Sequence, residues 1–395
     1  MNESDKLYEG AGDLTTDSLD ELLYDEYSFI DDDDNYTEEY LLEYKFKSFS
    51  EGLTEYIRSH GYSGDMDSID DKTDFIKQKC KDNNVTLNPS VVKTWFKDKR
   101  PRSGAESRTL VYKLCFALNM NAKEAADFFY KVYFECPFNF RIPDEAVIYY
   151  CLNNNKSYSE AELLKGKVKS ILEIAKPSEY EYDLTTAIGK DISNIQTDED
   201  FLDYISKNSA EFVAGNKTAY KYASKLITAV TDLAKKRCEN KEELKHRLGK
   251  DNNIDLFIYD LFGEDINQFK KDKSFSKASE FPELIKSNFP LKMQLSKVRN
   301  NEQLSYDTMR KALIELFFYK YFAELFEANT DEYFCIYEDD FRGYVAETND
   351  LLFSCGYPQL YVRNPYDWLF MHCANTPYPL EEFQNAVKRY YLDNI

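Results

Sequence analysis

One segment of this chain occurs twice, and the repetition limits the fold to an arrangement that contains two related modules. Arg141–Cys151 aligns without gaps with Arg363–Cys373. An arginine, a proline, an acidic residue, an apolar block and a cysteine stand at identical offsets in both segments. A match of this kind between distant segments predicts an internal duplication, in which each copy forms the same supersecondary unit.

Two further matches lie upstream in the same order in both copies, which extends the repeat over a whole module. The spacing between the arginine of the upstream match and the arginine of the repeated segment differs between the copies. Arg108 and Arg141 are 33 residues apart, whereas Arg310 and Arg363 are 53 residues apart. The extra residues fall near 327–344, which is acidic and aromatic, and we expect a surface excursion with some packing of its own. The upstream matches are Glu124–Tyr130 with Glu347–Phe353, and Ser103–Arg108 with Ser305–Arg310.

The repeated signature has a structural interpretation. The proline of each copy stands where a helix is expected to begin, and it is tolerated there because its missing N–H has no intrahelical partner. The acidic residue two positions later, Glu145 or Asp367, then lies near the positive end of the helix dipole. We expect Arg141 and Arg363 to pair with this acid or with the ends of preceding helices. The signature therefore predicts architecture rather than catalysis.

Composition favours a mainly α, multi-helix protein. Only 13 glycines and 11 prolines occur in 395 residues, so tight turns are few and long helices are favoured over a many-stranded sheet. A hydrophobic content of 43% is ordinary for a globular chain. We expect two helix-turn-helix-like modules joined by a helical middle region. The boundaries are 1–45 for an acidic arm, 46–164 for the first module, 165–277 for the middle region and 278–395 for the second, degenerate module.

Several classes of site are disfavoured by the sequence. The eight cysteines form no Cys-x-x-Cys pair and most lie in apolar helical stretches, which predicts buried, reduced thiols. The three histidines are scattered, and no glycine-rich phosphate loop is found. We therefore expect no metal, no cofactor and no enzymatic activity. With no leader-like N-terminus and no apolar run that could span a bilayer, we expect a cytoplasmic protein without membrane contact.

Charge is distributed unevenly along the chain. The formal net charge is −21, and residues 1–45 contribute −14 of it, from sixteen acids against two lysines. The run Asp31–Asp34 opposes a helix, and a solvated, disordered tail is the simplest interpretation. The mixture of acids with tyrosine, phenylalanine and leucine also suits a segment that docks onto a protein partner or onto the basic face of this chain.

The first module contains a local reversal of charge. Residues 93–113 carry seven basic and two acidic side chains. Asn88-Pro89-Ser90 is a helix-start signal, and Val91, Val92 and Trp95 or Phe96 can anchor the helix that follows. A short helix with an apolar inner face and a basic outer face is what a DNA-binding helix-turn-helix requires. In the second copy, residues 296–310 lack the tryptophan and the Lys-Arg-Pro-Arg cluster, which favours a structural or self-association role.

Val91–Arg102, followed by an apolar helix and Leu118–Asp127, resembles the XRE-type, lambda-repressor-like helix-turn-helix. Cys355–Phe370 resembles segments of Firmicutes proteins that carry such units. The chain departs from this family in the acidic arm and in residues 82–87, where the usual small residue is missing. The resemblance implies base contacts from Ser90, Lys93, Thr94 and Lys97, and phosphate contacts from Lys99, Arg100 and Arg102.

Two functions from different classes follow from these features. The first is a transcriptional regulator that binds double-stranded DNA through the first module, while the second module and the middle helices form a homodimer or sense a signal. The alternative is a protein-interaction or inhibitory protein, in which the acidic arm imitates nucleic acid or masks the basic face. An enzyme in the middle region is disfavoured, because no nucleophile–base pair or metal spacing is found there.

Overall fold

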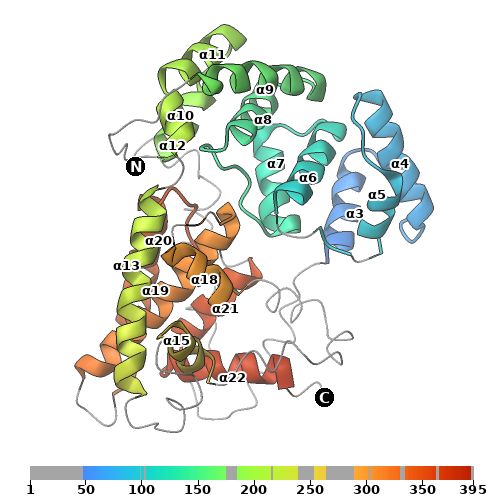
Figure 1. Ribbon diagram of the computed structural model, residues 1–395. Helices are drawn as coiled ribbons and strands as arrows, with labels where there is room; N and C mark the ends of the chain where they lie inside the picture. The colour runs from blue at the N-terminus through green and yellow to red at the C-terminus, as the bar shows by residue number, and fades with distance from the viewer. Residues whose placement is uncertain are drawn as a thin grey trace. The chain divides into compact units, whose positions relative to one another are not determined.

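The computed structural model is mainly helical, and the described residues include no β-strand (Figure 1), which confirms the expected fold class. Contacts divide the chain into two compact units, Phe46–Lys217 and Thr218–Ile395. The region expected as a separate middle, 165–277, is thus divided between the two units. The acidic arm lies outside the described residues. These are 48–97, 99–101, 104–174, 185–214, 217–238, 253–263, 289–300, 302, 304–329, 334–361 and 364–392.

The first unit is a succession of short helices around an aromatic core. Phe49 is fully buried and its ring makes edge contacts with Trp95 at 5.8 Å and Phe128 at 5.9 Å between centroids. These contacts hold three separate helices against one another. The helices are α3 (Phe49–Ser59), α4 (Ile69–Asp82), α5 (Pro89–Trp95), α6 (Ala105–Ala117), α7 (Ala122–Phe128), the π-helix η2 (Phe129–Tyr133), α8 (Pro143–Asn153), α9 (Tyr158–Glu173), α10 (Thr185–Ser193), α11 (Asp198–Lys207) and α12 (Ser209–Ala214).

The second unit is built around one long helix, α19 (Tyr306–Ala328), in which most residues from Tyr306 to Ala323 are buried. Phe318 in this helix contacts Phe370 and Phe383 at 5.1 and 5.6 Å, so α19 packs against the last two helices of the chain. The other described helices are α13 (Lys217–Arg237), α15 (Asn253–Phe262), α18 (Lys292–Arg299), α20 (Glu338–Ser354), α21 (Pro365–Ala374) and α22 (Pro379–Leu392).

Asparagine replaces glycine at several helix ends, which explains how a glycine-poor chain turns so often. Asn84, Asn119 and Asn155 have φ angles of 52°, 55° and 52°, in the left-handed region that asparagine tolerates better than most residues. At each of these ends, the N–H after the asparagine donates to the carbonyl of a cysteine five residues earlier. The bonds are Val85 to Cys80 at 2.8 Å, Met120 to Cys115 at 3.0 Å and Lys156 to Cys151 at 2.8 Å.

The repeated signature forms the same local structure in both units. Pro143 and Pro365 each begin a helix, α8 and α21, as the spacing predicts. The preceding helix ends in both copies at a left-handed residue, Phe134 with φ 57° and Gly356 with φ 72°. These residues lie at the same distance before their prolines, so the correspondence extends beyond the aligned segment.

Between the upstream match and the repeated signature, the first copy has one residue more than the second, and the π-helix accommodates it. The N–H of Glu135 donates to the carbonyl of Phe129, six residues earlier, at 3.2 Å. In the second copy the N–H of Tyr357 donates to Leu352, five residues earlier, at 2.8 Å. A π-helical turn accommodates one extra residue without ending a helix, so η2 keeps the flanking residues in register with the second copy.

Candidate nucleic-acid interface

Helices α4 and α5 pack against each other and are joined by the turn 83–88. Asn88 caps α5, its side chain accepting a 2.9 Å hydrogen bond from the Ser90 N–H, and Pro89 occupies the first turn. The amide of Asn83 donates to the carbonyl of Ala117 at 2.9 Å, which ties the turn to the end of α6. The helix start expected at Asn88-Pro89 is thereby confirmed.

The inward face of α5 is firmly anchored. Val92 and Trp95 are each 2% exposed, and Phe96 is buried beside them. The hydroxyl of Ser50 in α3 donates to the carbonyl of Phe96 at 3.2 Å. Because the apolar side of this short helix is fixed in the core, its opposite side is held toward solvent.

The outward face of α5 carries the polar residues selected from the sequence. Ser90 in the helix is exposed, and so are Lys97 and Lys99, which lie two and four residues beyond its last residue, Trp95. Within the described residues neither of these two lysines forms an ion pair. Thr94 is half-buried, and its hydroxyl donates to the carbonyl of Val91 at 2.6 Å.

Lys93 is engaged by an acid from the neighbouring helix. Its Nζ lies 2.5 Å from Oδ1 of Asp70 in α4, and the side chains of Lys93 and Asp70 are 42% and 75% exposed. The hydrogen bond and charge of Lys93 lower the pKa of the Asp70 carboxyl. An exposed pair of this kind is weak and easily exchanged for another anion. Lys93 therefore remains positioned toward solvent, but Asp70 competes with any other anion for its ammonium group.

Arg100 is used inside the first unit rather than on its surface. Its Nη1 donates to the carbonyl of Val132 at 2.6 Å, and its guanidinium lies 4.5 Å from the ring centroid of Phe134. These contacts fix the chain after α5 against the end of η2. The expected phosphate contact from Arg100 has no support in this placement, and Arg102 lies outside the described residues.

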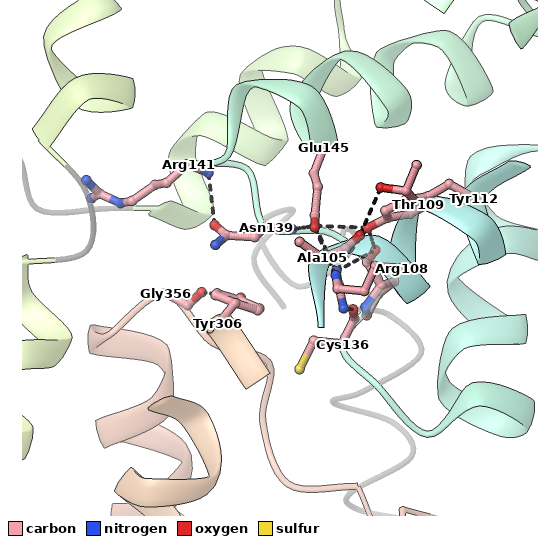
Figure 2. A network of polar contacts seen from close by, with 11 residues as sticks. Ala105, Arg108, Thr109, Tyr112, Cys136, Asn139, Arg141, Glu145, Tyr306 and Gly356 are labelled. Atoms are coloured by element: carbon pink, nitrogen blue, oxygen red, sulfur yellow. Dashed lines mark hydrogen bonds and ion pairs between the residues drawn. The ribbon is translucent and has the colours of Figure 1, made fainter. Parts of the chain in front are cut away.

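Arg108, which the sequence places in the same basic stretch, is buried in a clamp that links α6 to α8 (Figure 2). It donates from Nε and Nη2 to the two carboxylate oxygens of Glu145, at 2.9 and 2.8 Å, and from Nη1 to the carbonyl of Cys136 at 2.8 Å. The N–H of Asn139 and the hydroxyl of Tyr112 also donate to Glu145, at 2.7 and 2.9 Å. The acid of the signature is thus held by Arg108, which corrects the expected pairing with Arg141.

The second unit contains the same clamp with a shorter acid. Arg310 donates to both carboxylate oxygens of Asp367 at 2.7 Å, and both side chains are buried. It also donates to the carbonyls of Pro358 and Gln359, and the N–H of Tyr361 donates to Asp367 at 2.9 Å. In both units the two carbonyls belong to the residues nine and eight positions before the acid, and the N–H belongs to the residue six positions before it. In the first unit these residues are Cys136, Pro137 and Asn139. The clamp is therefore a duplicated structural device, and Arg363 lies outside the described residues.

Among the described residues, no group of side chains forms an alternative chemical site to this surface. No group of three or more His, Cys, Asp or Glu side chains there is placed to hold a metal ion. Seven of the eight cysteines are buried, as expected, and burial raises the pKa of Cys80 to about 11 and of Cys151 to about 12. Such thiols stay protonated and unreactive. None of the described helices combines the length and apolar character needed to cross a membrane.

Comparison of the chain with family models, with curated proteins and with solved structures gives no match in any of the three.

Proposed function

We propose that the first unit binds double-stranded DNA through the outward face of α5, and that the protein acts as a DNA-binding regulator. The observation that carries this proposal is the orientation of α5: Val92 and Trp95 fix one side in the core while Ser90 and Lys97 face solvent on the other. A short helix anchored in this way can enter a major groove with its polar side chains toward the base edges.

Each polar residue of this surface has a distinct role in the proposed complex. Ser90 and Thr94 offer hydroxyls, which hydrogen-bond to base edges or phosphates, and Lys93 and Lys97 offer cations. Lys99 follows the helix, where it suits a phosphate contact. Arg100 is left out of the interface because its guanidinium is engaged by Val132 and Phe134.

The local charge supports this assignment against the acidity of the whole chain. A protein of net charge −21 is repelled by DNA at long range, so binding requires a local surface on which basic side chains outnumber acids. From Pro89 to Lys97 the chain carries two lysines and no acid. Binding through this surface should be strongly dependent on salt, because each phosphate contact releases condensed counterions.

The test is fluorescence anisotropy of the full chain with a labelled random-sequence duplex, titrated at several salt concentrations. Replacing Lys97 and Lys99 with alanine should weaken binding about tenfold at low salt, and should reduce the slope of log K against log salt by about 1.8. Selection from the duplex pool then identifies any preferred sequence, and Ser90→Ala should alter that preference.

The matched control removes two lysines from another helix of the same unit. Lys167 and Lys169 in α9 are exposed, so the double variant Lys167→Ala/Lys169→Ala changes net charge by the same amount. It should bind like the wild type. Equal losses in the two double variants, or no loss in either, would show that α5 is not the contact surface.

A further inference from the structure

Helix α18 occupies in the second unit the place along the chain that α5 occupies in the first. The last residue of α5, Trp95, precedes the clamp arginine by 13 residues, and the last residue of α18, Arg299, precedes its clamp arginine by 11. Both helices pack on an earlier helix, α5 on α4 and α18 on α15. The two helices are therefore equivalents within the duplicated architecture.

The inward faces of the two helices have the same construction. In α5 the buried anchors are Val92 and Trp95, and in α18 they are Leu295 and Val298, again three residues apart and both 0% exposed. The positions that face away from these anchors in α5 are those of Ser90, Lys93, Thr94 and Lys97. In α18 and the residue that follows it, the corresponding positions hold Met293, Ser296, Lys297 and Asn300.

The same kind of ion pair flanks both helices. Nζ of Lys292 lies 2.8 Å from Oδ2 of Asp255 in α15, just as Lys93 pairs with Asp70 in α4. Neither Lys297 nor Arg299 forms an ion pair with another of the described residues. From Lys292 to Arg299 the chain has three basic residues and no acid.

The outward side chains of α18 are ones that read nucleic acid. Serine and asparagine hydrogen-bond to base edges and phosphates, lysine neutralises phosphate, and an apolar side chain can contact the thymine methyl group. Met293 is 64% exposed, so its side chain is accessible on this face. The lysine, the hydroxyl, the amide and the methionine share one face of a helix whose other face is fixed in the core.

We propose that α18 is a second surface for double-stranded DNA, so that one chain contacts duplex at two places, through α5 and through α18. This inference rests on the proposed function of the first unit and assigns the second unit a part in the same binding. The α18 surface is the weaker of the two, because it has an acid beside it: the carboxylate of Glu302 accepts a hydrogen bond from Asn300 at 3.3 Å. This assignment replaces the structural or self-association role that the sequence favours for the second copy.

The experiment compares the full chain on two duplexes. One helical turn is about 10.5 base pairs, so a duplex of about 12 base pairs accommodates a single contact surface and one of about 40 accommodates both. On the long duplex, Lys297→Ala/Arg299→Ala should weaken binding about three- to tenfold and reduce the salt slope by about 1 to 2. On the short duplex, which the stronger α5 surface occupies, the same variant should bind like the wild type. Glu302→Gln should tighten binding to the long duplex.

A second readout locates the contact directly. With p-benzoylphenylalanine in place of Met293, irradiation should crosslink the second unit to the long duplex, and the same group at exposed Leu163 in α9 should not crosslink. If Lys97→Ala/Lys99→Ala weakens binding but Lys297→Ala/Arg299→Ala does not, and no crosslink forms at Met293, the second surface is refuted and the first stands. If neither double variant affects binding to either duplex, the proposed function itself fails.

Discussion

The two units share their buried clamp but differ in what surrounds it. In both, an arginine from a helix rich in apolar residues holds the acid of a proline-started helix, and equivalent backbone groups complete the hydrogen bonds. Glu145 reaches its arginine with one methylene more than Asp367. A buried charge is costly unless it is fully paired, so neither partner could be lost alone as the copies diverged. Exposed residues have no such constraint, and the surfaces of the two units have diverged much further.

The interiors of the units differ clearly at the position five residues after the clamp arginine. Lys113 in α6 is half-buried, with Nζ 5.6 Å from the ring centroid of Tyr158. Its counterpart by position is Glu315 in α19, which is 0% exposed. The hydroxyl of Tyr366 donates to one Glu315 oxygen at 3.5 Å, and burial raises the pKa of the carboxyl well above its usual value. The second unit thus contains a buried acid at a position where the first keeps a cation in contact with water.

Breaking either clamp should have the largest effect on stability. Glu145→Ala leaves Arg108 buried without its carboxylate, and Asp367→Ala does the same to Arg310. Each change should lower the free energy of unfolding of its own unit by about 3–5 kcal/mol. Hydrogen exchange of the full chain, followed by mass spectrometry, assigns the loss to α6 and α8 or to α19 and α21. Asp203→Ala, which breaks an exposed pair with Lys207 in α11, is the control. A large loss of stability in only one of the two units would show that the clamps do not stabilise their units equally.

Removing the buried acid of the second unit should have the next largest effect. Glu315→Met replaces a carboxyl with too few partners by an apolar side chain, and should raise the free energy of unfolding by about 1–3 kcal/mol at neutral pH. The folded-state pKa of Glu315 is raised, so the folded protein binds this proton more tightly than the unfolded chain. Stability of the wild type should therefore fall as pH rises from the unfolded pKa through the raised folded one. Glu315→Gln should remove this dependence and exposed Glu381→Gln should not; an unchanged pH profile in Glu315→Gln contradicts the assignment.

Deletion of residues 1–45 tests whether the acidic arm acts on the basic surfaces. The arm carries −14 of the net charge, and its removal should tighten binding to duplex DNA roughly tenfold at low salt. The gain should shrink as salt is added. Weaker binding after truncation would show that the arm does not mask these surfaces but assists them.

A smaller effect is expected from the ion pair beside α5. Asp70→Asn removes the acid that competes for Lys93, and should tighten DNA binding about threefold because an exposed pair contributes little. Asp74→Asn, which affects only the exposed lysine Lys77 on the same helix, is the control. The corresponding change in the second unit, Asp255→Asn, should tighten binding only on the longer duplex. Equal effects of Asp70→Asn and Asp74→Asn would assign no role to Lys93.

The sequence was sufficient for the elements whose determinants are local. The helix class, the start of α5 at Asn88-Pro89 and the inward placement of Val92 and Trp95 follow from spacing, capping and proline chemistry over a few residues. The duplication was also readable, because its anchors lie within short segments. The DNA-binding role of the exposed residues stays a prediction.

The partners of the arginines could not be assigned so readily, because they depend on contacts over long sequence separations. Arg108 looks like part of a basic surface until its acid is located 37 residues downstream. One signal was available: both copies keep this arginine and this acid although the segment between them differs by twenty residues, which points to a direct contact. The equivalence of α5 and α18 was similarly hidden, because the helices share their burial pattern and not their residues.

The most direct test of the central claim is hydrogen–deuterium exchange of the full chain with and without duplex DNA. Our account predicts slower exchange in α5 and in the turn before it, residues 83–97, a smaller effect in 292–300, and no change in α9. Protection in α9 or elsewhere, with exchange in 83–97 unaltered by a duplex that the protein demonstrably binds, would contradict it.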